Sequence, residues 1–264
     1  MSLSPFLVSA RARIHDTDGA RRSVHLSRIV RRAGAHRLED LLADRAPLFY
    51  RSPDHIADML RAGYFRTAFR EALLQLPTST HFRDSHFAEI LSALFAEAAI
   101  GWRLLYSKLT LLTAQNANPY KMDLIFCDPN QNIPTFILAE VKSSPKSQVP
   151  ARHHRSCYPS LFDSLRDYSD DDLIYDLTAA RDNIDTLPES ERGTIRHALL
   201  PYARRQVLYA GFSVIDTVTR DETETSMLAT RNSPKTFDID LVCVDDFSAV
   251  SSSTYNLLDN MRHV

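Results

Sequence analysis

The feature that most constrains this chain is an apolar segment, residues 136–141, that ends in alternating charge. It reads Phe-Ile-Leu-Ala-Glu-Val and is followed directly by Lys142. An almost wholly apolar run of this length predicts a strand inside a sheet. Because side chains two residues apart share one face of a strand, Glu140 and Lys142 are expected to project together while Val141 packs on the other side. The chain must therefore build a sheet around this strand and keep two opposite charges at its end.

A second strand is predicted immediately before the first. Residues 122–127 are apolar apart from Asp123, and Asp128-Pro129-Asn130 is a turn sequence. If the two strands pair as a hairpin, Asp123 lies close to both Glu140 and Lys142. The sequence then predicts two carboxylates and one ammonium group converging at a sheet end.

An amphipathic helix and a third strand precede this hairpin. Residues 86–99 place apolar side chains at helical spacing, with Glu89 beside the apolar stripe. After Gly101 the period changes, and residues 104–112 are predicted as a strand. The predicted order is therefore one helix followed by three strands.

The rest of the chain alternates between helical and extended patterns. The segment before Tyr50 predicts one or two strands and a short helix at 38–43, and Ser52-Pro53 starts a helical pattern that runs to Leu76, either as one helix or as two broken near Gly63. Helices are further predicted at 158–168, 172–184, 189–205 and 253–261, and strands at 207–216 and 237–244, with a loop at 219–234. The sum predicts an α/β fold, with a mixed central β-sheet flanked by helices.

The convergent charges suit phosphodiester hydrolysis. Mg²⁺ prefers oxygen ligands and takes one or two carboxylates, while water and a substrate phosphate complete its shell. Asp123 and Glu140, with the Val141 carbonyl, are the candidate ligands for Mg²⁺ or Mn²⁺. Lys142 is the candidate to stabilise developing negative charge or to orient an attacking hydroxide. Glu89 is a candidate third acid.

Composition bounds the class of protein. The 264 residues are 44% hydrophobic and 24% charged, as in globular proteins. No run approaches the roughly 18 apolar residues that would predict a membrane span, and the first residues do not follow a signal-peptide pattern, so a cytoplasmic protein is expected. Three cysteines at long spacings predict neither a disulfide framework nor a cysteine zinc site.

The N-terminal part of the chain is locally basic although the formal net charge is −2. Residues 1–80 are therefore expected to form a basic segment with helices, which is either a solvated face or a surface that contacts a partner or DNA. Residues 81–264 are expected to form the catalytic domain. The basic side chains before Glu39 are Arg11, Arg13, Arg21, Arg22, Arg28, Arg31, Arg32 and Arg37.

Three other functions are less well supported. Asn118-Pro119-Tyr120 lacks one proline of the adenine-methyltransferase loop, and no Walker A sequence accompanies the acids at 238, 240, 245 and 246, which are expected to be solvated strand ends. His153, His154 and Cys157 lack a matching second pair for zinc. With Arg152 and Arg155, these histidines favour phosphate contact.

The order of elements and charges resembles the PD-(D/E)xK, or restriction-endonuclease-like, superfamily. A longer run resembles the HamA family, the nuclease subunit of the Hachiman anti-phage defence system. The family's Gly-x-Asp pattern is not kept, because Tyr120-Lys121-Met122 precedes Asp123. The resemblance is clear from Glu89 to Ser143, and beyond that it is one of helix pattern only. The motifs that carry it are Glu89-Ile90-Leu91, Leu105-Tyr106-Ser107-Lys108-Leu109, Thr113-Ala114-Gln115-Asn116, Met122-Asp123 and Ala139-Glu140-Val141-Lys142-Ser143.

This resemblance implies a restriction-endonuclease-like core with an N-terminal extension, and a Mg²⁺-dependent endodeoxyribonuclease. It further implies a helicase partner, HamB-like, that holds the nuclease until phage DNA is sensed. On the same resemblance Lys108 joins Glu89 as a second-tier site candidate, the alternatives being an exposed strand lysine and a paired helix glutamate. The alternative function is a catalytically silent nuclease-like fold that serves as a DNA-binding or scaffold subunit.

Overall fold

The computed structural model describes residues 2–17, 22–111, 122–144, 160–184, 187–219 and 237–263. Several sequence predictions fall outside these ranges. They are the basic residues 152–155 with Cys157, the methyltransferase-like residues 118–120, the motif at 113–116, and most of the loop expected at 219–234.

Within the described residues, seven strands form one mixed sheet in the order β1-β2-β9-β8-β7-β6-β5. Strands β2, β9, β8 and β7 run parallel to one another, whereas the pairs β1–β2, β7–β6 and β6–β5 are antiparallel. The mixed central sheet predicted from the sequence is thus confirmed. The strands are β1 (Leu7–Thr17), β2 (Arg22–Ile29), β5 (Arg103–Ser107), β6 (Leu124–Asp128), β7 (Thr135–Ser144), β8 (Gln206–Asp216) and β9 (Phe237–Val244), and a separate small hairpin pairs β3 (Arg32–Ala33) with β4 (His36–Arg37).

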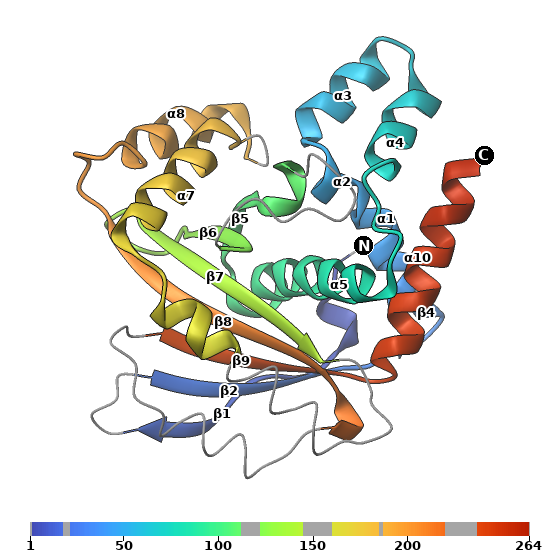
Figure 1. The fold of residues 1–264 in the computed structure, drawn as a ribbon, viewed down its shortest axis with the longest axis horizontal. Coiled ribbons are helices and arrows are strands. Elements are labelled where there is room, and N and C mark those ends of the chain that lie inside the picture. The colour runs from blue at the N-terminus through green and yellow to red at the C-terminus, as the bar shows by residue number, and fades with distance from the viewer. Residues whose placement is uncertain are drawn as a thin grey trace.

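Helices flank this sheet. Figure 1 shows α1 to α4 and α10 gathered on one side of the view, α7 and α8 on the other, and α5 lying along the sheet. The helices are α1 (Leu38–Arg45), α2 (Pro47–Tyr50), α3 (Pro53–Arg61), α4 (Phe65–Leu73), α5 (Thr80–Phe95), α7 (Asp170–Asp182), α8 (Glu189–Ala198) and α10 (Phe247–His263), with short turns η1 (Ser4–Phe6), η2 (Ala96–Ile100), η3 (Lys108–Leu111) and η4 (Thr217–Thr219). Residues 160–166 are also helical. Across the described part of the chain, no helix has the length and apolarity to cross a bilayer.

The two faces of β7 supply two different cores. Ile137, Ala139 and Val141 pack into the core that contains α5, whereas Phe136 and Leu138 pack into the core formed with residues 160–166 and α7. This is the period-two alternation expected of a strand that is buried on both faces. It confirms that Val141 lies on the side opposite Glu140.

Several helix boundaries follow local chemistry. Ser52 caps α3 by accepting a hydrogen bond from the His55 amide at 3.2 Å, and Gly63, at φ +83°, separates α3 from α4. The two-helix alternative is therefore the one observed. Ser169 and Asp172 form a capping box at the start of α7.

Several predicted boundaries were wrong. The helix expected at 189–205 ends at Ala198, and the helix expected from residue 86 begins at Thr80. The strand expected at 104–112 ends at Ser107, where the chain turns into the η3 helix at Lys108. The C-terminal helix begins at Phe247 and not at residue 253. Its first amide donates to Asp216 Oδ2 at 3.0 Å, so its cap comes from the end of β8 and leaves no local sequence signal.

Four of the N-terminal arginines, Arg11, Arg28, Arg31 and Arg37, form ion pairs within the fold. Arg11 pairs with Asp240, whose side chain is fully buried, and Arg28 pairs with Asp245. Arg31 and Arg37 both contact the buried Glu39. Asp240 is thus no solvated strand end, and burial raises its pKa to about 6 despite the opposing charge of Arg11.

Candidate active site

The β6–β7 hairpin places Asp123 beside Glu140. Leu124 pairs with Ala139 in antiparallel register, and the Asp123 amide donates to the Ala139 carbonyl at 3.1 Å. Strand β7 continues past this point to Ser144, beyond the start of β6. The Val141 N–H, left without a β6 partner, donates to Asp123 Oδ2 at 2.6 Å. Where the pairing of β6 with β7 ends, the free backbone amide of β7 therefore holds the Asp123 carboxylate in place.

Lys108 reaches Asp123 from the side of β6 that faces away from β7. Its main-chain amide donates to the Asp123 carbonyl at 3.1 Å. Its ammonium contacts Asp123 Oδ1 and lies 3.5 Å from Glu89 Oε1. Lys108 is only 6% exposed, so the expected alternative of an exposed strand lysine does not hold. The early end of β5 turns this side chain into the site.

Glu140 and Lys142 form an ion pair on one face of β7, as their spacing predicted. Glu140 is buried, whereas the Lys142 side chain is 28% exposed and stays within reach of an incoming molecule. Gly211 on β8 lies in register with Glu140 on β7. A Cβ at Gly211 would stand 2.8 Å from Leu161, so the missing side chain lets residues 160–166 pack closely beside Glu140.

Glu89 reaches the site from α5 and is 2% exposed. Burial raises its pKa to about 7; the charge of Lys108 opposes this rise, and the charge of Glu140 adds to it. Its Oε2 atom has no hydrogen-bond partner among the described residues. A buried acid beside a second acid and a lysine is the kind of group whose protonation responds near neutral pH.

This ionisation predicts a pH-dependent effect of Glu89→Gln in metal-free protein. The folded-state pKa is raised above the ordinary value of 4.5, so the wild-type chain loses stability as pH rises from about 4.5 through about 7. The glutamine variant lacks this loss. Its free energy of unfolding relative to wild type is expected to rise by about 3 kcal/mol over that window, as measured by urea unfolding at pH 4.5 and pH 8. A difference that does not change with pH would show that Glu89 does not titrate there.

Sequence reasoning missed two further groups at the site. His86, one turn before Glu89 on α5, is 3% exposed, and its Nδ1 lies 3.0 Å from the Tyr50 hydroxyl, which lies 3.1 Å from the hydroxyl of Tyr255. Burial, with a contribution from the charge of Lys108, lowers the pKa of His86 to about 3. The signal for His86 was its position three residues before Glu89 on the same helix.

The second missed group is Asp176 on α7, which is 1% exposed and accepts a hydrogen bond from the Met122 amide. The sequence held no signal for it, because an acid within a helix has many ordinary roles and α7 follows the hairpin at a distance.

The donor set of the site fits a hard divalent cation. Within the described ranges, no group of three or more His, Cys, Asp or Glu side chains is arranged to hold a metal. Mg²⁺ needs only one or two carboxylates, and Asp123 and Glu140 supply two. The N–H and C=O of one strand residue point to the same edge, so the Val141 carbonyl lies on the Asp123 side of β7. The unpartnered Glu89 oxygen beside Glu140 shows an excess of buried acid that a cation would offset.

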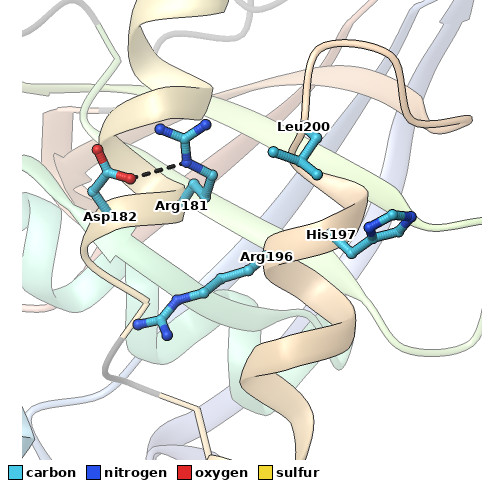
Figure 2. Close-up of a pocket in the computed structure, with 5 residues that line it drawn as sticks. All are labelled: Arg181, Asp182, Arg196, His197 and Leu200. Carbon is cyan, nitrogen blue, oxygen red and sulfur yellow. Dashed lines mark hydrogen bonds and ion pairs between the residues drawn. The ribbon is translucent and has the colours of Figure 1, made fainter.

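A surface cavity elsewhere on the molecule does not coincide with this site. Figure 2 shows it beside α7 and α8. At this cavity Arg181 Nε donates a hydrogen bond to Asp182 Oδ1 at 2.9 Å. The cavity is lined by Arg181, Asp182, Arg196, His197 and Leu200. None of the predicted site residues lines this cavity, so it is separate from the candidate active site at the end of the β6–β7 hairpin.

Comparison with protein families gives a match over most of the chain. The chain matches the family model for HamA over residues 6–256. No curated protein matches it. The family match spans all seven strands of the sheet and every candidate site residue. This chain therefore belongs to the HamA family, a component of the Hachiman defence system.

Proposed function

We propose that this chain is a metal-dependent DNA endonuclease, the effector of a Hachiman complex with a helicase partner. The observation that carries the proposal is the convergence of Asp123, Glu140 and Lys142 at the end of the β6–β7 hairpin. Lys108, at the start of η3, and Glu89, on α5, complete the cluster. Family membership supports the defence role and the choice of partner.

Asp123, Glu140 and the Val141 carbonyl are the groups that would hold Mg²⁺ or Mn²⁺. The bound ion would supply Lewis-acid polarisation of the scissile phosphate and a lowered pKa for coordinated water. The Val141 N–H and Lys108 hold the Asp123 carboxylate in place. Lys142, the more exposed of the two ammonium groups, stabilises negative charge that develops on the phosphate or orients the attacking hydroxide.

One observation favours a second candidate, a silent nuclease-like scaffold. Both Asp123 oxygens already accept contacts, one from Lys108 and one from the Val141 amide. In that case the lysine permanently replaces a cation, and the fold binds DNA or its partner without cutting. This candidate predicts binding that survives Glu140→Ala and no metal-dependent cleavage.

The test is cleavage of supercoiled and linear DNA by the purified chain, alone and with its helicase partner. We expect cleavage in Mg²⁺ or Mn²⁺ and none in EDTA. Absence of cleavage with every divalent metal, with and without the partner, would reject the nuclease and leave the scaffold.

A further inference from the structure

A buried acid on α7 approaches the site from outside the hairpin. Asp176 Oδ2 accepts two hydrogen bonds, from the Met122 amide at 3.2 Å and from the Tyr168 hydroxyl at 2.7 Å. Asp176 Oδ1 is buried and has no hydrogen-bond partner within the part of the chain described. Burial raises the pKa of Asp176, and the charge of Glu140 is among the further causes, so these two acids are within electrostatic range.

The bond to Met122 matters because Met122 is the residue directly before Asp123. Strand β6 begins only at Leu124, so neither residue is held by regular strand pairing. The Asp123 amide is held by the Ala139 carbonyl, and the Met122 amide by Asp176. The Met122 amide belongs to the peptide group before Met122 and the Asp123 amide to the one after it, so both peptide groups that flank Met122 are fixed. The Lys108 amide, which donates to the Asp123 carbonyl, fixes the next peptide group. Asp176 therefore holds the backbone that leads into Asp123, and with it the position from which the Asp123 side chain starts.

We propose that Asp176 is a positioning residue that aims Asp123 at the cation. This inference rests on the proposed function in that it takes Asp123 as a metal ligand. Asp176 acts through the Met122 amide and not as a ligand itself. Groups that orient metal ligands without touching the ion affect metal affinity about 10- to 100-fold. A purely structural role, holding α7 on the sheet through Tyr168, would change stability and leave metal affinity alone.

The test compares Mn²⁺ binding by Asp176→Ala and Asp176→Asn with that of the wild-type full-length chain. Free Mn²⁺ is followed by electron paramagnetic resonance, and thermal unfolding is followed in EDTA. Asp176→Ala is expected to weaken Mn²⁺ binding about tenfold. Asp176→Asn is expected to stay within about threefold of wild type, because its amide oxygen still accepts from Met122. The matched control is Asp182→Ala, on the same helix and 56% exposed, which should bind as wild type does.

Two results would overturn the positioning role of Asp176. Wild-type affinity in Asp176→Ala would overturn the inference, and so would an equal loss in Asp176→Asn, since the charge and not the hydrogen bond would then be responsible. If Asp176→Ala does not fold, Asp176→Ser keeps a polar group but shortens the side chain, so that its oxygen no longer reaches the Met122 amide, and it is expected to show the same tenfold loss. Mn²⁺ binding by wild type, together with no DNA cleavage in any divalent metal with or without the helicase partner, would reject the proposed function alone. No Mn²⁺ binding by wild type would reject both.

Discussion

Replacing Lys142 by methionine is expected to slow Mg²⁺-dependent DNA cleavage by about 10²- to 10³-fold, the usual cost of losing one group that stabilises transition-state charge. Methionine keeps most of the side-chain length and removes the ammonium group that pairs with Glu140. Because lysine is not a metal ligand, Mn²⁺ binding should remain. The measurement is the initial rate of plasmid nicking, with Mn²⁺ affinity determined on the same preparation.

The control for this variant is Arg61→Met, a cation-to-methionine change at a side chain that is 74% exposed and far along the chain from the site. Its cleavage rate should equal that of wild type. A Lys142→Met rate within about threefold of wild type would remove Lys142 from the chemistry.

Replacing Lys108 by methionine is expected to lower the free energy of unfolding by about 3–5 kcal/mol at pH 7. The ammonium is buried between Asp123 and Glu89, which are themselves buried. Removing one partner of such a cluster leaves negative charge without compensation in a region poor in water, and that desolvation cost is the reason for the large effect. Urea unfolding in EDTA measures it.

Two comparisons separate this effect from general damage. Adding Asp123→Asn to Lys108→Met removes the charge left uncompensated and should recover part of the lost stability. Arg166→Met breaks ion pairs with Asp163 and Asp167 on the exposed surface and should leave the urea midpoint unchanged. A loss below about 1 kcal/mol for Lys108→Met would mean that the site tolerates unpaired acids and that Lys108 is dispensable.

The hairpin at the centre of the site could be predicted from local sequence. Residues 136–141 are apolar, a turn sequence at Asp128 precedes them, and period-two spacing puts Glu140 and Lys142 on one face. These signals act over a few residues. The pairing of the two strands and the helix that bears Glu89 could therefore be predicted without reference to the rest of the chain.

The inward position of Lys108, a site candidate only by the family resemblance, could not be predicted from the local sequence, because β5 ends where the chain meets Asp123 and not at a turn residue. The same holds for the arginines of the first forty residues. Arg11 and Arg28 are neutralised by acids on and just after β9, more than two hundred residues later in the chain. Parallel pairing of β2 with β9 brings these segments together, and such long-range pairing leaves no local trace.

Cleavage of supercoiled plasmid by wild type and Glu140→Ala in parallel tests the central claim most directly. The assay should run in Mg²⁺ and in EDTA, with the helicase partner present and DNA binding measured in the same samples. Glu189→Ala, whose side chain is 89% exposed, is the matched control. The site described here predicts cleavage by wild type and the control in Mg²⁺ only, and DNA binding without cleavage by Glu140→Ala. Equal cleavage by Glu140→Ala, or equal cleavage in EDTA, would contradict it.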